Sequence, residues 1–200
     1  MAPYALAADE SCRKVKIGSM DITAHESLTW KYILNQLISG QDLGSRHVDW
    51  AMDEIMTGST PEPILASFLT SLHMKGETSE ELGALARGML AKAETIDLDV
   101  HAVDIVGTGG DQQNTVNIST MAALVIAGTG ATVVKHGNRA STSKSGSADV
   151  LEALGIQLDM PIKSVAACAR QVGITFLFAM TFHPSMRFVG PTRKMLGIPT

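Results

Sequence analysis

The chain has 200 residues, 45% hydrophobic and 18% charged, so it can bury a core and bulk disorder is excluded. Its 16 basic and 20 acidic residues give a net charge of −4, which argues against a general nucleic-acid binder with a basic face. Cys12 and Cys168 are too few for a disulfide framework, and no segment reads as a signal peptide or membrane span, so we expect a soluble, cytoplasmic protein.

The first half of the chain predicts a bundle of four helices behind an irregular tail at residues 1–24. Apolar residues recur at helical spacing in four consecutive segments, and the last begins with the capping-box pair Thr78 and Glu81. The four apolar stripes are Trp30, Ile33, Leu34, Leu37 and Ile38; Val48, Ala51, Met52, Ile55 and Met56; Ile64, Leu65, Phe68, Leu69 and Leu72; and Leu82, Leu85, Ala86, Met89 and Leu90. We therefore expect a helical bundle domain at residues 25–98.

From about residue 100, short apolar strands alternate with helices. The expected strands are residues 103–106, 132–135, 156–158 and 174–179, and the expected helices lie at about residues 121–127, 150–154 and 161–172. This alternation predicts a mainly parallel sheet flanked by helices. The fold class is thus α/β with a separate small all-α domain, the α/β domain comprising residues 99–182 and 198–200. So few parallel strands would leave an open apolar edge, so we expect this domain to be truncated and its sheet incomplete at the C-terminus.

The first candidate site is a glycine-rich loop after the first predicted strand. It consists of Gly107, Thr108, Gly109, Gly110 and Asp111. Three glycines in four positions let backbone N–H groups approach an anion without hindrance from Cβ atoms, and the Asp would bind a ribose hydroxyl or a metal-bound water. Taken alone, the loop fits a tight turn with a capping Asp equally well.

The second candidate site lies where the apolar helix begins, at Asn117, Ser119 and Thr120. A hydroxyl at this position is an ordinary N-cap in many helices. Because the helix follows the glycine-rich loop, its free N–H groups and hydroxyls would point at the same anion from the positive end of the helix dipole. The context therefore favours phosphate binding.

The third candidate site is the polar loop of residues 135–147. Lys135 ends a buried strand, where an unpaired cation is costly, and Arg139 and Lys144 add positive charge among compact Ser and Gly donors. A solvated surface loop is also polar, but its basic residues seldom begin at a strand end. Taken together, the three loops predict a site for a polyanion with more than one phosphate.

Common catalytic patterns are missing from the sequence, which has no P-loop, no GxSxG nucleophile elbow and no Cys/His cluster. Donors and cations without a nucleophile suit a reaction in which a leaving group departs from a sugar while the protein positions the reactants and neutralises charge.

Several segments together resemble the anthranilate phosphoribosyltransferases of the nucleoside phosphorylase/phosphoribosyltransferase family. They are VGTGGD, NISTMAA, KHGNRASTSKSGSADVLEALG, FHPSM…TRKMLGIPT and, in the helical part, HMKGET. The resemblance covers residues 27–200. It implies a helical domain that forms a homodimer, onto which residues 183–197 return, and an active site in the cleft beside the α/β domain. It also implies transfer of the phosphoribosyl group of phosphoribosyl pyrophosphate (PRPP) to the amine of anthranilate, with release of pyrophosphate, as the second step of tryptophan biosynthesis from chorismate.

The resemblance also implies roles for individual residues. PRPP is expected to contact Gly107, Thr108, Gly109, Gly110, Asp111, Asn117, Ser119, Thr120, Lys135, Ser143, Ser145 and Gly146. Anthranilate is expected at Gly107, His136, Asn138 and Arg193. The guanidinium fork of Arg193 matches a carboxylate, although a cation near a helix end is an alternative reading. Ser119 is expected to bind Mg²⁺. No acid or base is assigned, and Lys135 and His136 would position the substrates.

Two departures from the family pattern qualify this assignment. Met180 stands where the family usually has proline, at the expected anthranilate entrance. The family also continues past Thr200 with a second hinge, further strands and an acidic Asp-Glu pair that binds magnesium, so we expect these 200 residues to bind PRPP weakly and turn over little. The alternatives are a pyrimidine nucleoside phosphorylase-like enzyme and a truncated, non-catalytic, dimerising paralogue.

Overall fold

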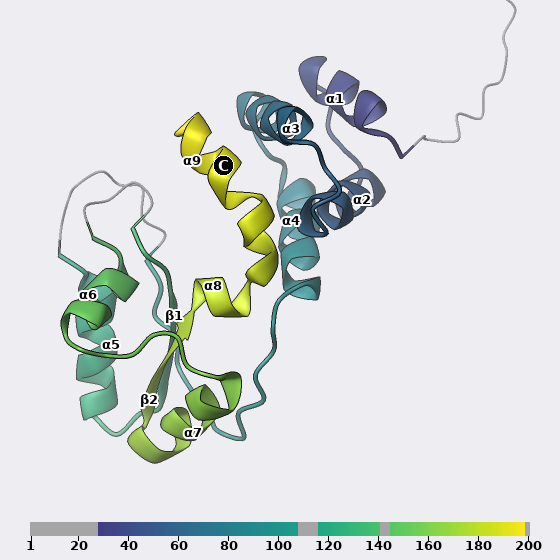
Figure 1. The fold of residues 1–200 in the computed structure, drawn as a ribbon. Coiled ribbons are helices and arrows are strands. Elements are labelled where there is room, and N and C mark those ends of the chain that lie inside the picture. Colours follow the sequence, from purple (N-terminus) through teal and green to yellow (C-terminus); the bar gives the residue numbers. More distant parts are fainter. Residues whose placement is uncertain (1–27, 108–115, 141–144, 199–200) are drawn as a thin grey trace, which may run out of the picture.

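A bundle of helices and an α/β unit lie side by side in the computed structural model, which describes residues 28–107, 116–140 and 145–198 (Figure 1). This arrangement confirms the predicted fold class. The expected tail at residues 1–24 lies outside the described residues. No helix within those described ranges combines the length and the apolar character that crossing a bilayer requires.

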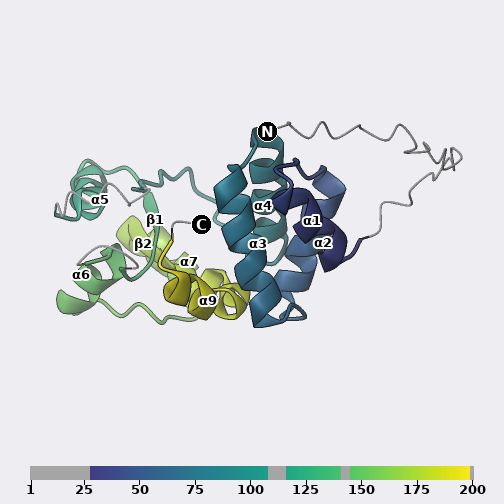
Figure 2. The ribbon, with the colours of Figure 1, turned by 90° about the horizontal axis from the view of Figure 1, so that it is seen from above.

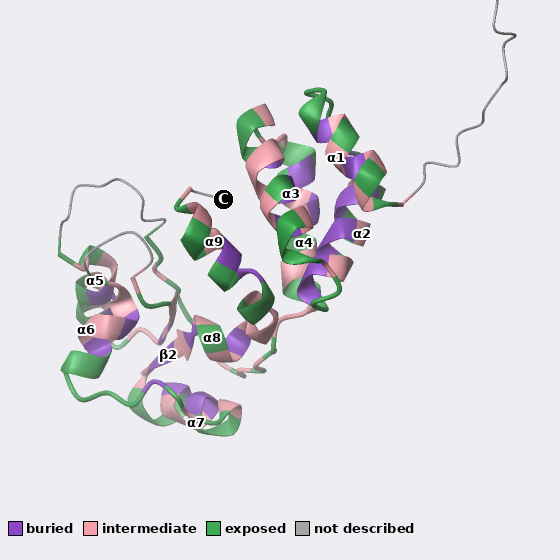
Figure 3. Ribbon diagram, turned by 45° about the horizontal axis from the view of Figure 1, so that its top comes forward, coloured by how far each residue is buried: buried purple, intermediate pink, exposed green. Residues whose placement is uncertain are grey.

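The bundle consists of α1 (Trp30–Ile38), α2 (Ser45–Met56), α3 (Glu62–Lys75) and α4 (Ser79–Ala91). Helix α1 packs on α3, and α2 packs on α4. The buried residues gather on the inner faces of these helices (Figure 3). Aromatic rings join the pairs, because the ring of Trp30 lies 5.3 Å from that of Trp50 and 5.6 Å from that of Phe68, measured between centroids. Most residues of the first three predicted stripes therefore form one core. The exceptions are Ile38, which is the last residue of α1 and is 73% exposed, and Ile64, which lies outside the core cluster.

Helix α4 begins with the predicted capping box. The Glu81 N–H donates to Thr78 Oγ1, and the Thr78 N–H donates to Glu81 Oε2. The same carboxylate accepts the Leu43 N–H at 2.8 Å and the Lys75 ammonium at 2.7 Å. One buried glutamate thus ties the α1–α2 loop, the end of α3 and the start of α4 together.

The predicted buried face of α4 is partly wrong. Leu82, Ala86 and Leu90 are exposed, whereas Glu81 and Ala84 are buried. The physical reason is the ion pair of Glu81, which fixes the rotation of the helix and leaves part of the apolar stripe on the surface. Tertiary contacts here override the preference that apolar periodicity expresses.

The α/β unit contains α5 (Ile118–Gly128), β1 (Val133–Gly137), α6 (Ser147–Ala153), α7 (Ile162–Val172) and β2 (Ile174–Phe178). Strands β1 and β2 are parallel, with Val133 opposite Ile174 and Gly137 opposite Phe178. Helices α5 and α6 lie on one side of the strands and α7 on the other (Figures 1 and 2). The carboxyl ends of both strands point to the same edge, where ligands bind in open parallel sheets.

The strand expected at residues 103–106 is reduced to one bridge, between Val103 and Val133. A longer parallel ladder would require the His136 N–H to bond to the Ile105 carbonyl. Instead, that N–H donates to Asp104 Oδ1 at 3.1 Å, and the carbonyl accepts the Lys135 ammonium. The side chains of Asp104 and Lys135 thus take the place of the backbone hydrogen bond between His136 and Ile105.

The strand expected at residues 156–158 is absent from the described fold, where this segment is an irregular connection. The Ile156 N–H donates to the Leu151 carbonyl at 3.0 Å and so closes the end of α6 rather than pairing with a strand. Leu158 is still buried, because it packs with Phe176 and Phe178 under α6.

The chain then returns to the bundle through α8 (Ala179–Phe182), the 3₁₀ helix η1 (Pro184–Phe188) and α9 (Gly190–Leu196). Helix α9 packs on α3, η1 packs on α2, and Val189 belongs to the core of the bundle. The Glu94 N–H donates to the Phe182 carbonyl at 2.8 Å, so the outgoing and returning chain crossings lie beside each other.

Candidate functional site

Lys135 links the segment that precedes the glycine-rich loop to the start of α5. The residue is only 4% exposed, and its ammonium donates to the Ile105 carbonyl at 2.7 Å and to Ser119 Oγ at 3.2 Å. Ile105 lies two residues before the glycine-rich loop, and Ser119 lies in the first turn of α5. Burial lowers the pKa of Lys135 below its ordinary value, and the carboxylate of Asp104 opposes this effect.

A second contact joins α5 to the third loop. Asn117 is the N-cap residue of α5, but its side chain makes no capping hydrogen bond. Its amide Nδ2 instead lies 3.4 Å from Ser145 Oγ and 3.5 Å from the Ser145 carbonyl. The structure therefore brings Asn117, Ser119, Lys135 and Ser145 together around the N-terminus of α5.

The third loop is held at its base by residues outside the predicted site. Gly146, the N-cap residue of α6, donates its N–H to Asp149 Oδ2, and so does Ala140. Arg139 pairs with Glu152 through two hydrogen bonds of 2.6 and 3.0 Å. Arg139 was expected to add positive charge to the anion site, but its guanidinium is instead paired with the carboxylate of Glu152.

His136 follows Lys135 on β1 and faces the returning chain. Its ring lies 5.2 Å from that of His183, measured between centroids, and its Nε2 is buried with no hydrogen-bond partner among the described residues. Burial lowers the pKa of His136, the charges of His183 and Lys135 add to this effect, and Asp104 opposes it. At neutral pH the imidazole is therefore neutral and offers one donor and one acceptor.

The other expected anthranilate residues are not joined to this cluster. Asn138 is exposed, and its Oδ1 accepts the N–H of Arg139. Arg193 lies on α9, and within the described ranges no hydrogen bond or ion pair connects it to His136 or Asn138. Its Nε is buried and has no partner among the same residues.

Of the remaining expected PRPP residues, the structure describes only Gly107 and Thr120. Gly107 is described and exposed, with open space where a Cβ would stand, whereas Thr120 is 3% exposed with its hydroxyl unpartnered among the described residues. Thr108, Gly109, Gly110, Asp111 and Ser143 lie outside the described residues, as does Lys144.

Sequence reasoning missed Asp104, Asp149 and His183. An acidic residue beside an expected anion site attracts no attention when only the sequence is read. One usable signal was present, because Asp149 stands at the third helical position after Gly146, where acidic side chains commonly bond to the N-cap N–H.

The fit of a magnesium ion is tested by the oxygen donors of the site. In the part of the chain that the structure describes, no three His, Cys, Asp or Glu side chains gather as a metal site. Ser119 Oγ is an oxygen donor beside the expected phosphates, and Mg²⁺ commonly takes few protein ligands together with phosphate oxygens and water. Ser119 therefore fits as one ligand of a phosphate-bound magnesium ion.

The chain matches two parts of one protein family. Residues 31–93 match the glycosyl transferase family, helical bundle domain, and residues 99–200 match the glycosyl transferase family, a/b domain. The second match alone covers half of the chain.

Individual relatives agree with this match. The chain is 57% identical over 172 residues to an anthranilate phosphoribosyltransferase from Arthrobacter sp. (strain FB24), covering 86% of this chain and 49% of that protein. The crystal structure of anthranilate phosphoribosyltransferase from Thermus thermophilus is 41% identical, with a TM-score of 0.77 over 84% of this chain and 51% of that one. A Saccharomyces cerevisiae anthranilate phosphoribosyltransferase in complex with PRPP and Mg is 34% identical, with a TM-score of 0.79 over 88% of this chain and 53% of that one.

The chain thus spans about half the length of the relatives that it matches. On the two domain matches, it belongs to the glycosyl transferase family in which a helical bundle domain precedes an a/b domain.

Proposed function

We propose that the chain carries the PRPP site of an anthranilate phosphoribosyltransferase, which transfers a phosphoribosyl group from PRPP to anthranilate and releases pyrophosphate. The main support is the buried ammonium of Lys135, which links Ile105, two residues before the glycine-rich loop, to Ser119 at the N-terminus of α5. An ammonium has three N–H donors, and among the described residues two are used, so one remains for a phosphate oxygen.

The proposed phosphate site combines three kinds of donor. The N-terminus of α5 supplies the positive end of a helix dipole and the N–H of Ser119, whereas the N–H groups of Ile118 and Thr120 donate to the Val116 and Asn117 carbonyls. Lys135 supplies a fixed cation, and Asn117 and Ser145 supply polar side chains on the other side of the helix start. Bound magnesium, with Ser119 as one ligand, would neutralise charge on the departing pyrophosphate.

Anthranilate is proposed to approach between His136 and Arg193. The guanidinium of Arg193 would bind the carboxylate, and the neutral imidazole of His136 would orient the ring. The amine nitrogen forms a bond to C1 of the ribose as the bond from C1 to the pyrophosphate oxygen breaks, and the amine gives up one proton to water or to pyrophosphate. No strong base is required, because an aromatic amine is already unprotonated at neutral pH.

We also propose that the helical bundle forms a homodimer. Leu82 and Leu90 are exposed on α4 by 53% and 68%, and such apolar surface commonly marks an interface. Sedimentation of the wild type and of the double variant Leu82→Glu/Leu90→Glu tests this proposal, and a monomeric wild type would overturn it. We place the enzyme in the cytoplasm, and the free thiol of Cys168 suits a reducing compartment.

The test of the proposed function is binding and turnover with defined ligands. Calorimetry with PRPP and Mg²⁺ should show binding to the chain, and the change from anthranilate to its N-ribosylated product should be followed by fluorescence. We expect weak PRPP binding and little turnover from these 200 residues. Near-full activity would contradict the second expectation and support the function itself.

Two other outcomes favour the rival functions. Turnover that requires thymidine and inorganic phosphate would indicate a nucleoside phosphorylase. The absence of PRPP binding, combined with a stable dimer, would indicate a non-catalytic module and would overturn the proposed function.

A further inference from the structure

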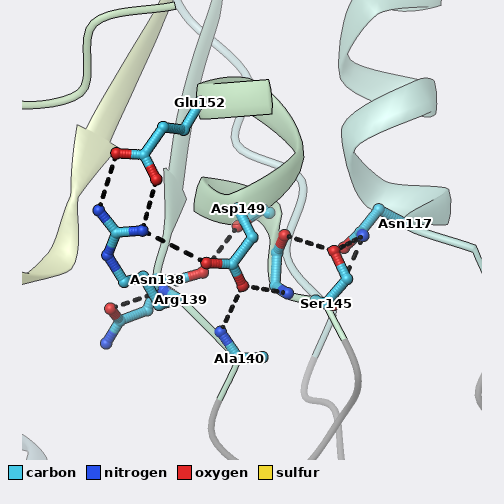
Figure 4. A network of polar contacts seen from close by, with 9 residues as sticks. Asn117, Asn138, Arg139, Ala140, Ser145, Asp149 and Glu152 are labelled. Atoms are coloured by element: carbon cyan, nitrogen blue, oxygen red, sulfur yellow. Dashed lines mark hydrogen bonds and ion pairs between the residues drawn. The ribbon is translucent and has the colours of Figure 1, made fainter. Parts of the chain in front are cut away.

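One carboxylate oxygen connects the two sides of the third loop. Asp149 Oδ2, in the first turn of α6, accepts the Ala140 N–H at 2.9 Å and the Gly146 N–H at 2.7 Å (Figure 4). These donors lie on either side of residues 141–144. Because a single atom accepts both bonds, it fixes the distance between the two N–H groups.

The same two sides meet backbone to backbone. A Cβ atom on Gly146 would lie 2.6 Å from the Asn138 carbonyl oxygen and would collide with the Ala140 nitrogen. The Asn138 carbonyl also accepts the Ala148 N–H at 3.2 Å. Only glycine therefore fits at residue 146, and the spacing at the base of the loop has little freedom.

The charge of Asp149 is directed at donors inside the protein. Asp149 Oδ1 lies 3.5 Å from Arg139 Nη1, and Arg139 is bonded more closely to Glu152. The guanidinium also lies over the Phe178 ring, 5.7 Å from its centroid, at the end of β2. A carboxylate near a phosphate site would repel the ligand, but here its charge is directed at two N–H groups and a guanidinium. The N–H donors from Ala140 and Gly146 lower the pKa of Asp149, so it remains ionised at neutral pH.

The loop base leads directly to the proposed phosphate site. Ser145 precedes Gly146 in the chain and faces the Asn117 side chain at the N-terminus of α5 (Figure 4). A shift of Gly146 would therefore move Ser145 relative to Ser119 and Lys135. Sub-ångström placement of donors is what binding of a charged ligand at a fixed site requires.

We propose that Asp149 is a positioning residue of the PRPP site, whose Oδ2 holds Ala140 and Gly146 at the spacing that places Ser145 and the backbone of Gly146 against the ligand. The inference rests on the proposed function, because it names the residue that shapes the same site. Asp149 does not touch the ligand itself.

The test separates geometry from charge with three substitutions. In Asp149→Asn, the side-chain oxygen can occupy the Oδ2 position and accept both N–H groups, so PRPP affinity should stay within about threefold of wild type. Asp149→Ala removes both bonds and releases Gly146 and Ser145 from their positions, so it should weaken PRPP binding about tenfold or more, the effect of misplacing a hydrogen-bond donor to a charged ligand. Asp149→Glu keeps the charge and suits the start of a helix but moves the acceptor, and it should also weaken binding.

Three measurements accompany each variant. Calorimetry with PRPP and Mg²⁺ gives the affinity, and thermal unfolding shows that the variant is folded. The amide proton signals of Ala140 and Gly146 in NMR spectra should lose the downfield shift of a hydrogen bond in Asp149→Ala and in Asp149→Glu but keep most of it in Asp149→Asn. Glu152→Gln is the control, because it removes the main partner of Arg139 while leaving both N–H bonds, and its PRPP affinity should match wild type.

The outcomes distinguish a failure of the positioning role of Asp149 from a failure of the proposed function. Wild-type PRPP affinity in Asp149→Ala or Asp149→Glu would overturn the positioning role and leave the proposed function standing, as would an Asp149→Asn variant as weak as Asp149→Ala. A wild-type chain that does not bind PRPP would overturn the proposed function, and this inference with it.

Discussion

The ammonium nitrogen of Lys135 lies 3.2 Å from the hydroxyl oxygen of Ser119, although 16 residues separate them in the chain. The contact joins the middle of β1 to the start of α5, because β1 continues to Gly137, two residues past the strand end predicted at Lys135. It also places a cation beside the hydroxyl that is proposed to bind magnesium. Two neighbouring cations repel each other, and an anion bound between them would offset that repulsion. A diphosphate is such an anion.

Replacing Lys135 with methionine tests this arrangement. Lys135→Met keeps the length of the side chain and removes the charge, so PRPP affinity should fall about tenfold or more. The fold should persist, because burial already disfavours the charged form of this lysine. Lys163→Met, at an exposed lysine of α7, is the matched control. Calorimetry should show the loss only in the first variant, and equal affinities would place the anion elsewhere.

A second prediction concerns the stability of the bundle. The side chains of Lys75 and Glu81 are only 4% and 1% exposed, and their charged atoms lie 2.7 Å apart. Glu81→Ala leaves the buried ammonium with a weaker set of partners and removes the acceptor of two backbone N–H groups. The free energy of unfolding should fall by about 3 to 5 kcal/mol, as for other broken buried pairs. Urea denaturation measures the change.

The neighbouring Glu80 provides the control, since it is exposed and, among the described residues, accepts a hydrogen bond from the Ser45 hydroxyl alone. Glu80→Ala should change the unfolding free energy by at most about 1 kcal/mol. Burial acts to raise the pKa of Glu81, but the hydrogen bonds from Lys75, Thr78 and Leu43 outweigh it and lower the pKa below 4.5. The contribution of Glu81 should be complete above pH 4.5 and be lost as the pH falls through the folded value. Equal losses in both variants would disprove the special role of Glu81.

Sequence patterns correctly predicted the features that depend on residues close together in the chain. The spacing of apolar residues located α1, α2 and α3, and a lysine at a strand end indicated that Lys135 needs a partner. Sequence patterns failed where a residue far away in the sequence determines the end of a strand or the buried face of a helix. Asp104 bonds to His136, which is 32 residues away, and thereby ends the expected strand at Val103. The burial of Glu81 likewise depends on Leu43 and so is invisible in the sequence of α4.

The charge state of His136 yields a pH prediction. Its pKa is lowered in the folded chain from an ordinary value of 6.5, chiefly by burial and then by His183. As the pH falls below 6.5, the unfolded chain takes up the proton first, so stability should decline until the pH passes the folded pKa and then level off. Above pH 6.5 the residue should have no effect. Thermal unfolding from pH 8 to pH 5 should show a smaller decline in His136→Gln than in wild type, while His73→Gln, at an exposed histidine of α3, should follow wild type. Parallel curves for all three proteins would rule out His136 as the source.

Arg193 is proposed to bind anthranilate and not PRPP. Its guanidinium Nε is buried on α9 without a hydrogen-bond partner among the described residues, and an unpaired buried donor is costly until a ligand bonds to it. Arg193→Ala should weaken anthranilate binding about tenfold or more while changing PRPP affinity about threefold at most, because a guanidinium fork binds a carboxylate through two bonds. Arg193→Lys keeps the charge without the fork and should recover only part of the loss. Arg187→Ala removes an exposed guanidinium that lies over the Phe188 ring and serves as the control. Fluorescence titration with anthranilate and calorimetry with PRPP measure the two affinities, and equal losses of both would show that Arg193 supports the fold rather than anthranilate.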